Sequence, residues 1–210
     1  MMKDLPQPAA NLGKFQDRFV TADGQTRASV PLSCPETLWF NTGTLCNIEC
    51  SNCYILSSPA NDALVYLTAA EAEDYLDQIE ARGWPVREIG FTGGEPYMNP
   101  DMSAMTRAAL ARGYDVLVLT NAMRPMMRKS VRDGLLELHQ AYPGKLTLRV
   151  SLDHYTADRH DEERGEGSFA KTLEGMDWLR DSGIAMAVAG RTVWGESEQQ
   201  ARVGFAALFA

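Results

Sequence analysis

Three closely spaced cysteines are the residues of this chain best suited to chemistry. Cys46, Cys50 and Cys53 follow the pattern C-x3-C-x2-C and come directly after an apolar run that ends near residue 42. Protein iron–sulfur clusters are held by cysteine thiolates, usually four of them. Three thiolates on one short loop can hold a four-iron cluster and leave one iron without a protein ligand. The spacing therefore predicts a [4Fe-4S] cluster with an open coordination position.

Two other arrangements compete with that prediction. Cys34, the fourth cysteine, could be a partly buried thiol without a role, or a fourth ligand that would close the cluster. A structural zinc site would need four ligands, usually in two paired sets. The remaining candidate ligands do not form such a pair: Cys34, His139, His154 and His160. Zinc binding and simple electron transfer are therefore the less favoured alternatives.

Length and composition describe one ordinary globular domain. The 210 residues are enough to bury a sizeable core, and the net charge of −8 lacks the basic footprint of a nucleic-acid binder. An apolar run of the length that crosses a membrane is missing, and the first residues do not resemble a secretory signal. Few cysteines, mostly crowded together, do not form a disulfide framework. We expect a cytoplasmic protein that binds neither nucleic acid nor membrane.

Predicted strands and helices alternate along most of the chain. Residues 1–36 carry several prolines and are expected to form an N-terminal extension, with a short strand near residues 27–30. The strands are expected at residues 37–42, 87–92, 114–120, 145–152 and 184–190. The helices are expected at residues 69–82, 100–112, 125–141, 168–181 and 196–209. This alternation predicts a parallel α/β sheet with right-handed crossovers, too short to close comfortably into a barrel.

Every predicted strand ends in polar or reactive residues. Functional groups of parallel α/β folds gather at the carboxyl ends of the strands, so these residues are expected to meet in one site. In chain order they are the cysteine loop, Gly93-Gly94-Glu95-Pro96, Thr120-Asn121, Ser151 with Asp153, and Arg191. Their common position argues for a site more strongly than any one of these motifs does.

Several charged residues near the fourth strand have less certain roles. Asp153 and His154 could face a substrate, or Asp153 could cap the following element. His160, Asp161 and Arg164 are expected to belong to a solvated charged segment.

These motifs together resemble the radical S-adenosylmethionine (radical SAM) enzymes. The resemblance rests on the cysteine pattern after the first strand, the GGEP sequence after the second, Leu119-Thr120-Asn121 and Val150-Ser151-Leu152-Asp153. A later stretch, His160-Asp161-x-x-Arg164-Gly165, is similar to the subgroup of molybdenum-cofactor cyclases and peptide maturases. Two positions depart from the pattern, since Ala122 and His154 stand where glycine is common.

The resemblance implies a fold and a set of roles. The core, residues 37–210, would be a partial (β/α)6 TIM-type barrel with about five βα units, truncated at its C-terminus. Cys46, Cys50 and Cys53 would bind three irons, and SAM would bind the fourth. Catalytic Glu95 would accept hydrogen bonds from the ammonium group of SAM. The other SAM contacts would come from Asn52, Gly93, Gly94, Thr120, Asn121, Ser151 and Arg191, the last facing the SAM carboxylate.

The implied activity is reductive cleavage of SAM, which yields a 5′-deoxyadenosyl radical that abstracts hydrogen from a substrate. The resemblance also implies an electron donor such as a flavodoxin- or ferredoxin-like protein. The substrate could be a small molecule or a peptide. An alternative is a cluster- and SAM-binding module, or a fragment, that is inactive alone.

Overall fold

The computed structural model describes residues 16–210 and divides the chain into two units, Met1–Cys34 and Pro35–Ala210. Within the described part of the first unit, Val20 and Thr26 form an isolated antiparallel bridge. The strand predicted near residues 27–30 is absent, because these mostly exposed residues pair with no other strand. Cys34 is exposed.

The second unit is built on one parallel sheet. Its strands pair in chain order, so both edges stay open in the described part of the chain. The strands are β1 (Thr37–Asn41), β2 (Glu88–Thr92), β3 (Asp115–Thr120), β4 (Leu146–Ser151) and β5 (Ala185–Ala189). This confirms the predicted parallel α/β architecture that does not close into a barrel.

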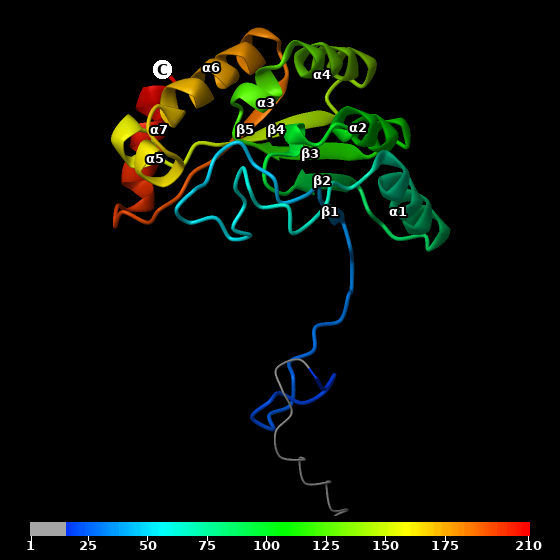
Figure 1. The fold of residues 1–210 in the computed structure, drawn as a ribbon. Helices are drawn as coiled ribbons and strands as arrows, with labels where there is room; N and C mark the ends of the chain where they lie inside the picture. Colours follow the sequence, from blue (N-terminus) through cyan, green and yellow to red (C-terminus); the bar gives the residue numbers. More distant parts are fainter. Residues whose placement is uncertain (1–15) are drawn as a thin grey trace, which may run out of the picture. The chain divides into compact units, whose positions relative to one another are not determined.

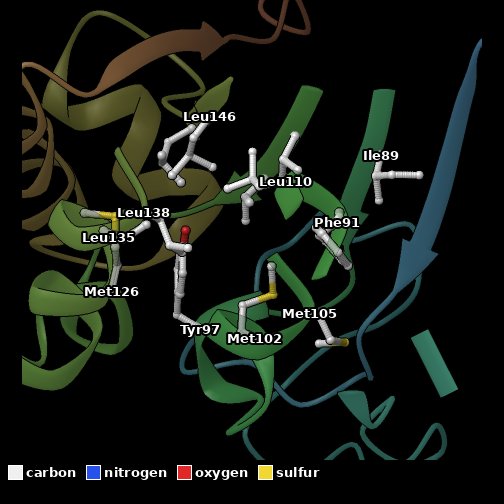
Figure 2. Close-up of a cluster of buried hydrophobic side chains, with 14 of the residues drawn as sticks. Ile89, Phe91, Tyr97, Met102, Met105, Leu110, Met126, Leu135, Leu138 and Leu146 are labelled. Atoms are coloured by element: carbon white, nitrogen blue, oxygen red, sulfur yellow. The ribbon is translucent and has the colours of Figure 1, made fainter. Parts of the chain in front are cut away.

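One face of the sheet carries the core. Phe91, Val118 and Leu148 stand side by side in the register of neighbouring strands and are fully inaccessible to solvent. Figure 1 shows helices α1 (Ala69–Ala81), α2 (Met102–Ala111), α4 (Lys129–Ala141) and α6 (Ser168–Asp181) along one side of this sheet, from α1 at the right to α4 and α6 at the top. Figure 2 shows how side chains from strands and helices meet in this layer, which methionines help to fill.

Local sequence signals explain where several elements begin. Thr68 and Glu71 form a capping box at the start of α1, in which each side chain accepts a hydrogen bond from the other residue's backbone N–H. Ser197 and Gln200 form the same arrangement at α7 (Glu198–Leu208). A 3₁₀ turn, η1 (Pro96–Met98), directly follows the GGEP glycines.

One helix prediction needed correction, and one helix was not predicted. The helix predicted over residues 125–141 is interrupted at Arg128, whose ψ of 139° is extended and separates α3 (Arg124–Met127) from α4. The Arg128 guanidinium donates hydrogen bonds to the carbonyl oxygens of Pro125 and Tyr97, which stabilises this break. A further helix, α5 (Ala157–Arg164), lies in the segment expected to be solvated.

None of the helices between residues 16 and 210 is both long and apolar enough to cross a bilayer.

Candidate active site

A cavity of about 150 Å³ lies at the carboxyl ends of the strands. It brings together most of the residues predicted for the site: Cys46, Cys50, Cys53, Gly93, Gly94, Thr120, Asn121, Ser151 and Arg191. Arg164, for which the sequence predicted no site role, also lines it. Asn52 and Glu95 lie outside its lining. Parallel pairing explains the convergence, because it places all strand ends at the same edge of the sheet.

The glycine turn after β2 holds the start of the cysteine loop. Gly94 N–H donates to Gly43 O at 2.9 Å, and Glu95 N–H donates to Leu45 O at 3.1 Å. A Cβ atom on Gly94 would lie 2.2 Å from Leu45 O, so only glycine allows this approach. Gly93 has a φ of +142°, which L side chains rarely adopt. The glycines are thus required by contact with residues 43–45, in addition to any contact with a bound molecule.

The cysteine loop is closed by its own hydrogen bonds. Cys46 N–H donates to Ser58 O at 3.1 Å, where the chain returns to the beginning of the loop. Cys53 N–H donates to Cys50 O at 3.2 Å, and Ser57 N–H lies 3.2 Å from the Cys53 sulfur. An N–H group aimed at sulfur stabilises its thiolate form and tunes a bound cluster.

The electrostatic surroundings differ between the cysteines. Burial raises the pKa of the Cys46 thiol to about 12. Burial also raises the pKa of Cys50, while the nearby Arg164 guanidinium acts to lower it. Because cysteine binds metals as thiolate, loading of this site must release protons.

The donor set fits a cluster better than a single ion. Among residues 16–210, no three His, Cys, Asp or Glu side chains are arranged closely enough to hold one metal ion. In a four-iron cluster each thiolate binds a different iron, so donors distributed around a cavity are the appropriate arrangement. The three cysteines around one cavity satisfy this requirement.

A buried ionic network lies beside the cavity. The Asp153 carboxylate accepts two hydrogen bonds from Arg164, at 2.8 and 3.0 Å, and a third from Arg191 Nε at 3.1 Å. Asp153 is 2% exposed, so its charge depends on these two partners. Asp153 therefore neither caps a helix nor faces the cavity.

Helix α5 attaches the second half of the cysteine loop to this network. Ser51 N–H donates to Glu163 O at 2.9 Å, and Asn52 Nδ2 donates to Glu163 Oε1 at 2.7 Å. Arg191 Nη1 donates to Asn52 O at 3.1 Å. Arg191, expected to face the SAM carboxylate, thus binds Asp153 and the loop backbone while also lining the cavity.

The expectation of a solvated segment after β4 was wrong. His160 is fully buried, and its Nδ1 accepts a hydrogen bond from Asp153 N–H at 3.2 Å. Burial lowers the pKa of His160 to about 4. The i, i+3 and i+4 spacing of His160, Glu163 and Arg164 was the signal for a helix face. This helix was not predicted from the sequence because its buried face is made of polar residues that bind other polar groups, not of apolar residues.

Glu95 connects two strand ends instead of lining the cavity. Its carboxylate accepts hydrogen bonds from Thr120 Oγ1 at 2.9 Å, Asn121 N–H at 2.8 Å and Tyr97 N–H at 3.2 Å. Burial raises its pKa to about 7, although these hydrogen bonds act in the opposite direction. In this geometry Glu95 positions Thr120 and Asn121, which do line the cavity.

The residues after β3 reach back to the first cysteine. Asn121 Nδ2 donates to Asn47 Oδ1 at 2.9 Å and lies 4.0 Å from the Cys46 sulfur. Ala122 has a φ of +57°, the left-handed conformation that a glycine would adopt without strain. The backbone of the TNG-like turn is therefore retained despite the alanine.

His154 belongs to a separate aromatic group. It stacks on Tyr155 with ring centroids 4.0 Å apart, and its Nε2 lies 3.3 Å from Glu196 Oε1. Tyr155 OH donates to Glu196 Oε2 at 3.0 Å. These contacts hold the segment before α7 against the sheet, and His154 does not line the cavity.

The chain is similar to several known proteins. The family model described as the Radical SAM superfamily matches residues 40–200. The antilisterial bacteriocin subtilosin biosynthesis protein AlbA of Bacillus subtilis is 32% identical over 180 residues, covering 83% of this chain and 37% of AlbA. The mycofactocin maturase MftC of Mycobacterium ulcerans is 29% identical over 156 residues, covering 74% of this chain and 39% of MftC.

Among solved structures, SuiB of Streptococcus suis bound to S-adenosylmethionine shares the fold. Its TM-score is 0.67 at 18% identity, and the match covers 84% of this chain and 38% of SuiB. A second structure shows SuiB bound to the precursor peptide SuiA. The chain thus spans less than two fifths of the length of each of these proteins.

Proposed function

Because the chain belongs to the radical SAM superfamily, we propose that it holds a [4Fe-4S] cluster and cleaves SAM reductively. The observation that carries this proposal is the shared cavity of Cys46, Cys50 and Cys53 beside the glycine turn. The three cysteines would bind the cluster, and SAM would occupy the remaining cavity. A bound cluster and SAM supply an electron-driven cleavage that yields a 5′-deoxyadenosyl radical able to abstract hydrogen.

The protein's own residues prepare this site. Arg164 and Arg191 place positive charge beside Cys50, which favours its thiolate and partly offsets the cost of burial. Thr120, Asn121 and Ser151 offer hydroxyl and amide groups for the methionine or ribose part of SAM. Asn52 and Glu95 would support them from outside the cavity lining, by holding the loop and the β3 end.

We infer that the substrate is a peptide. Support comes from similarity to AlbA and to a mycofactocin maturase, and from the fold shared with SuiB, which was solved with a precursor peptide. The reaction needs an external reductant, and a flavodoxin- or ferredoxin-like protein would supply the electron.

A second candidate is a cluster- and SAM-binding unit that is inactive alone. The observation that favours it is the short match, because the chain spans 37% of AlbA. In that case the cluster and SAM would bind, but cleavage would require additional protein.

Anaerobic reconstitution with iron and sulfide tests these proposals. We expect iron–sulfur absorption and, after addition of dithionite and SAM, release of 5′-deoxyadenosine measured by chromatography. Alanine variants of Cys46, Cys50 and Cys53 should lose the iron, while the matched control Cys34→Ala should retain it. Cluster and SAM binding without cleavage would support the inactive unit. Bound zinc without SAM binding would refute both proposals.

A further inference from the structure

Strand β4 presents one cation on the face of the sheet that bears the site. Its residues alternate in burial, so that Leu146, Leu148 and Val150 are buried under the helices. Thr147, Arg149 and Ser151 point to the opposite face and are partly exposed. Ser151 lines the cavity. Arg149 precedes it by two residues, or about 7 Å along the strand.

The neighbouring strands place Arg149 inside this face rather than at its edge. Leu119 on β3 and Ala187 on β5 are its partners in register, and Leu119 also lines the cavity. Ala185 and Ala187 are small, which leaves space on the β5 side of the guanidinium. Arg149 is not itself part of the cavity lining, but it lies next to the lining residues Leu119 and Ser151, on the side toward the amino ends of the strands.

The same face of the sheet also carries an exposed indole, three strands away from Arg149 on β1. Trp39 is 43% exposed and lies across Gly90, where a Cβ atom would be 2.4 Å from the indole ring. Leu117 stands next to Gly90 in register, on the same face. An arginine with the partly exposed Leu119 beside it, and an indole farther along the same face, can bind a ligand that combines a carboxylate with apolar groups.

Arg149 differs from the other arginines of the site in having no protein anion. Within residues 16–210 it forms no hydrogen bond or ion pair, whereas Arg164 and Arg191 both bind Asp153. The acidic residues that share its face lie at the amino ends of their strands. Asp115 pairs there with Lys145 at 2.8 Å. The guanidinium is thus available to an external anion.

We propose that Arg149 binds a carboxylate of the substrate, which makes an acidic peptide the preferred substrate class. The proposal rests on the proposed function, because it assumes that the substrate enters beside the cavity. A planar guanidinium can hold a carboxylate through two parallel hydrogen bonds, which would set the orientation of the peptide on the sheet. Leu119, the partner of Arg149 in register, would contact an apolar side chain next to the acidic residue.

Binding of two defined peptides tests this role. The probes are acetyl-hexaglutamate amide and acetyl-hexaglutamine amide, titrated by calorimetry into the reconstituted full chain at physiological salt. We expect Arg149→Gln to weaken hexaglutamate binding at least about tenfold, a loss typical of removing one partner of a charged contact. Arg149→Lys should retain part of the affinity, and hexaglutamine should bind equally weakly to all variants.

Arg180→Gln is the matched control, because Arg180 is an exposed arginine on α6 that pairs with Asp177 and Asp181 and lines neither the cavity nor the face of Arg149. It should leave hexaglutamate binding unchanged. Equal binding by wild type and Arg149→Gln, or an equal loss in Arg180→Gln, would overturn the proposal. So would a loss of SAM affinity in Arg149→Gln without a loss for hexaglutamate, since Arg149 would then serve SAM.

Two further measurements keep the outcomes separate. Thermal unfolding and iron–sulfur absorption of Arg149→Gln show whether a lost affinity reflects a misfolded protein, and Arg149→Lys provides a charge-preserving second variant. Peptide binding does not require SAM cleavage. If the wild type released no 5′-deoxyadenosine, the proposed SAM cleavage would be contradicted. The role of Arg149 would still be tested separately by the peptide titrations.

Discussion

The two halves of the cysteine loop are held by different kinds of interaction. The Cys46 end is fixed by backbone hydrogen bonds to the glycine turn after β2, in a contact that leaves no room for a side chain. The Cys50–Cys53 end is fixed by side chains of α5 and by Arg191, through an ionic network around Asp153. The first anchor depends on close packing, and the second depends on charge.

This difference assigns separate tasks to the two anchors. The packed anchor buries Cys46 and raises the pKa of its thiol. The charged anchor places Arg164 beside Cys50, where it favours the thiolate. One half of the loop therefore sets the position of the cluster site, and the other half supplies the positive charge that offsets its thiolates.

The largest effect is expected from Asp153→Ala, which breaks the charged anchor. It removes the buried anion that Arg164 binds, leaves Arg191 only the longer ion pair with Glu163 at 3.7 Å, and should lower the free energy of unfolding by about 3–5 kcal/mol. Chemical denaturation measures this loss. Asp133→Ala is the control, because its exposed pair with Lys129 should contribute less than about 1 kcal/mol. Similar losses in the two variants would contradict the importance of the network.

The packed anchor should respond to pH through Glu95. Its folded pKa is about 7 and its ordinary pKa is 4.5, so the folded state retains a proton that the unfolded state has lost. The free energy of unfolding should therefore fall as pH rises from about 4.5 to about 7, by an amount on the order of 3 kcal/mol.

The difference between wild type and Glu95→Gln isolates this effect. Buried His160, with a lowered pKa, adds stability over part of the same range as pH rises. Denaturation of both proteins at several pH values should show the wild type losing stability relative to Glu95→Gln. Parallel pH profiles would show that Glu95 is ionised at its ordinary pKa.

Gly94→Ala changes the packed anchor directly. The added methyl group would overlap Leu45 O, and overpacking of this kind costs about 1–3 kcal/mol. The fractional loss of bound iron after reconstitution should exceed the fractional loss of unfolding free energy, because the backbone shift occurs next to Cys46. Gly134→Ala on α4 is the control, since the nearest atom to its new Cβ lies 3.4 Å away. Normal iron content in Gly94→Ala would refute this view of the turn.

The smallest effect is expected from Ser51→Ala in the charged anchor. It removes an exposed hydrogen bond from Ser51 Oγ to Glu162 O but leaves the backbone bond to Glu163. The free energy of unfolding should fall by about 1 kcal/mol or less. A loss as large as that of Asp153→Ala would mean that single hydrogen bonds, not the ionic network, hold this end.

Local patterns were sufficient to predict the framework. Continuous apolar runs such as β3 indicated strands covered by helices, and Thr68 with Glu71 marked the start of α1. Order along the chain then implied parallel pairing, which brings the strand ends together whatever the details of packing. For the same reason the cysteines, the glycine turn, Thr120 and Ser151 could be assigned to one site from the sequence.

The sequence by itself determined the parallel sheet and the types of residue at its edge, because both follow from periodicity and from residue type at strand ends. The tertiary structure decided which polar groups face the cavity and which support it. Three polar residues at strand ends illustrate this. Asp153 and Glu95 bind other side chains and do not line the cavity, whereas Arg191 binds Asp153 and also lines the cavity. Which way such a side chain points depends on partners that are distant in the sequence. Some of these partners lie on α5, whose buried residues are polar and therefore give no apolar periodicity that would predict the helix.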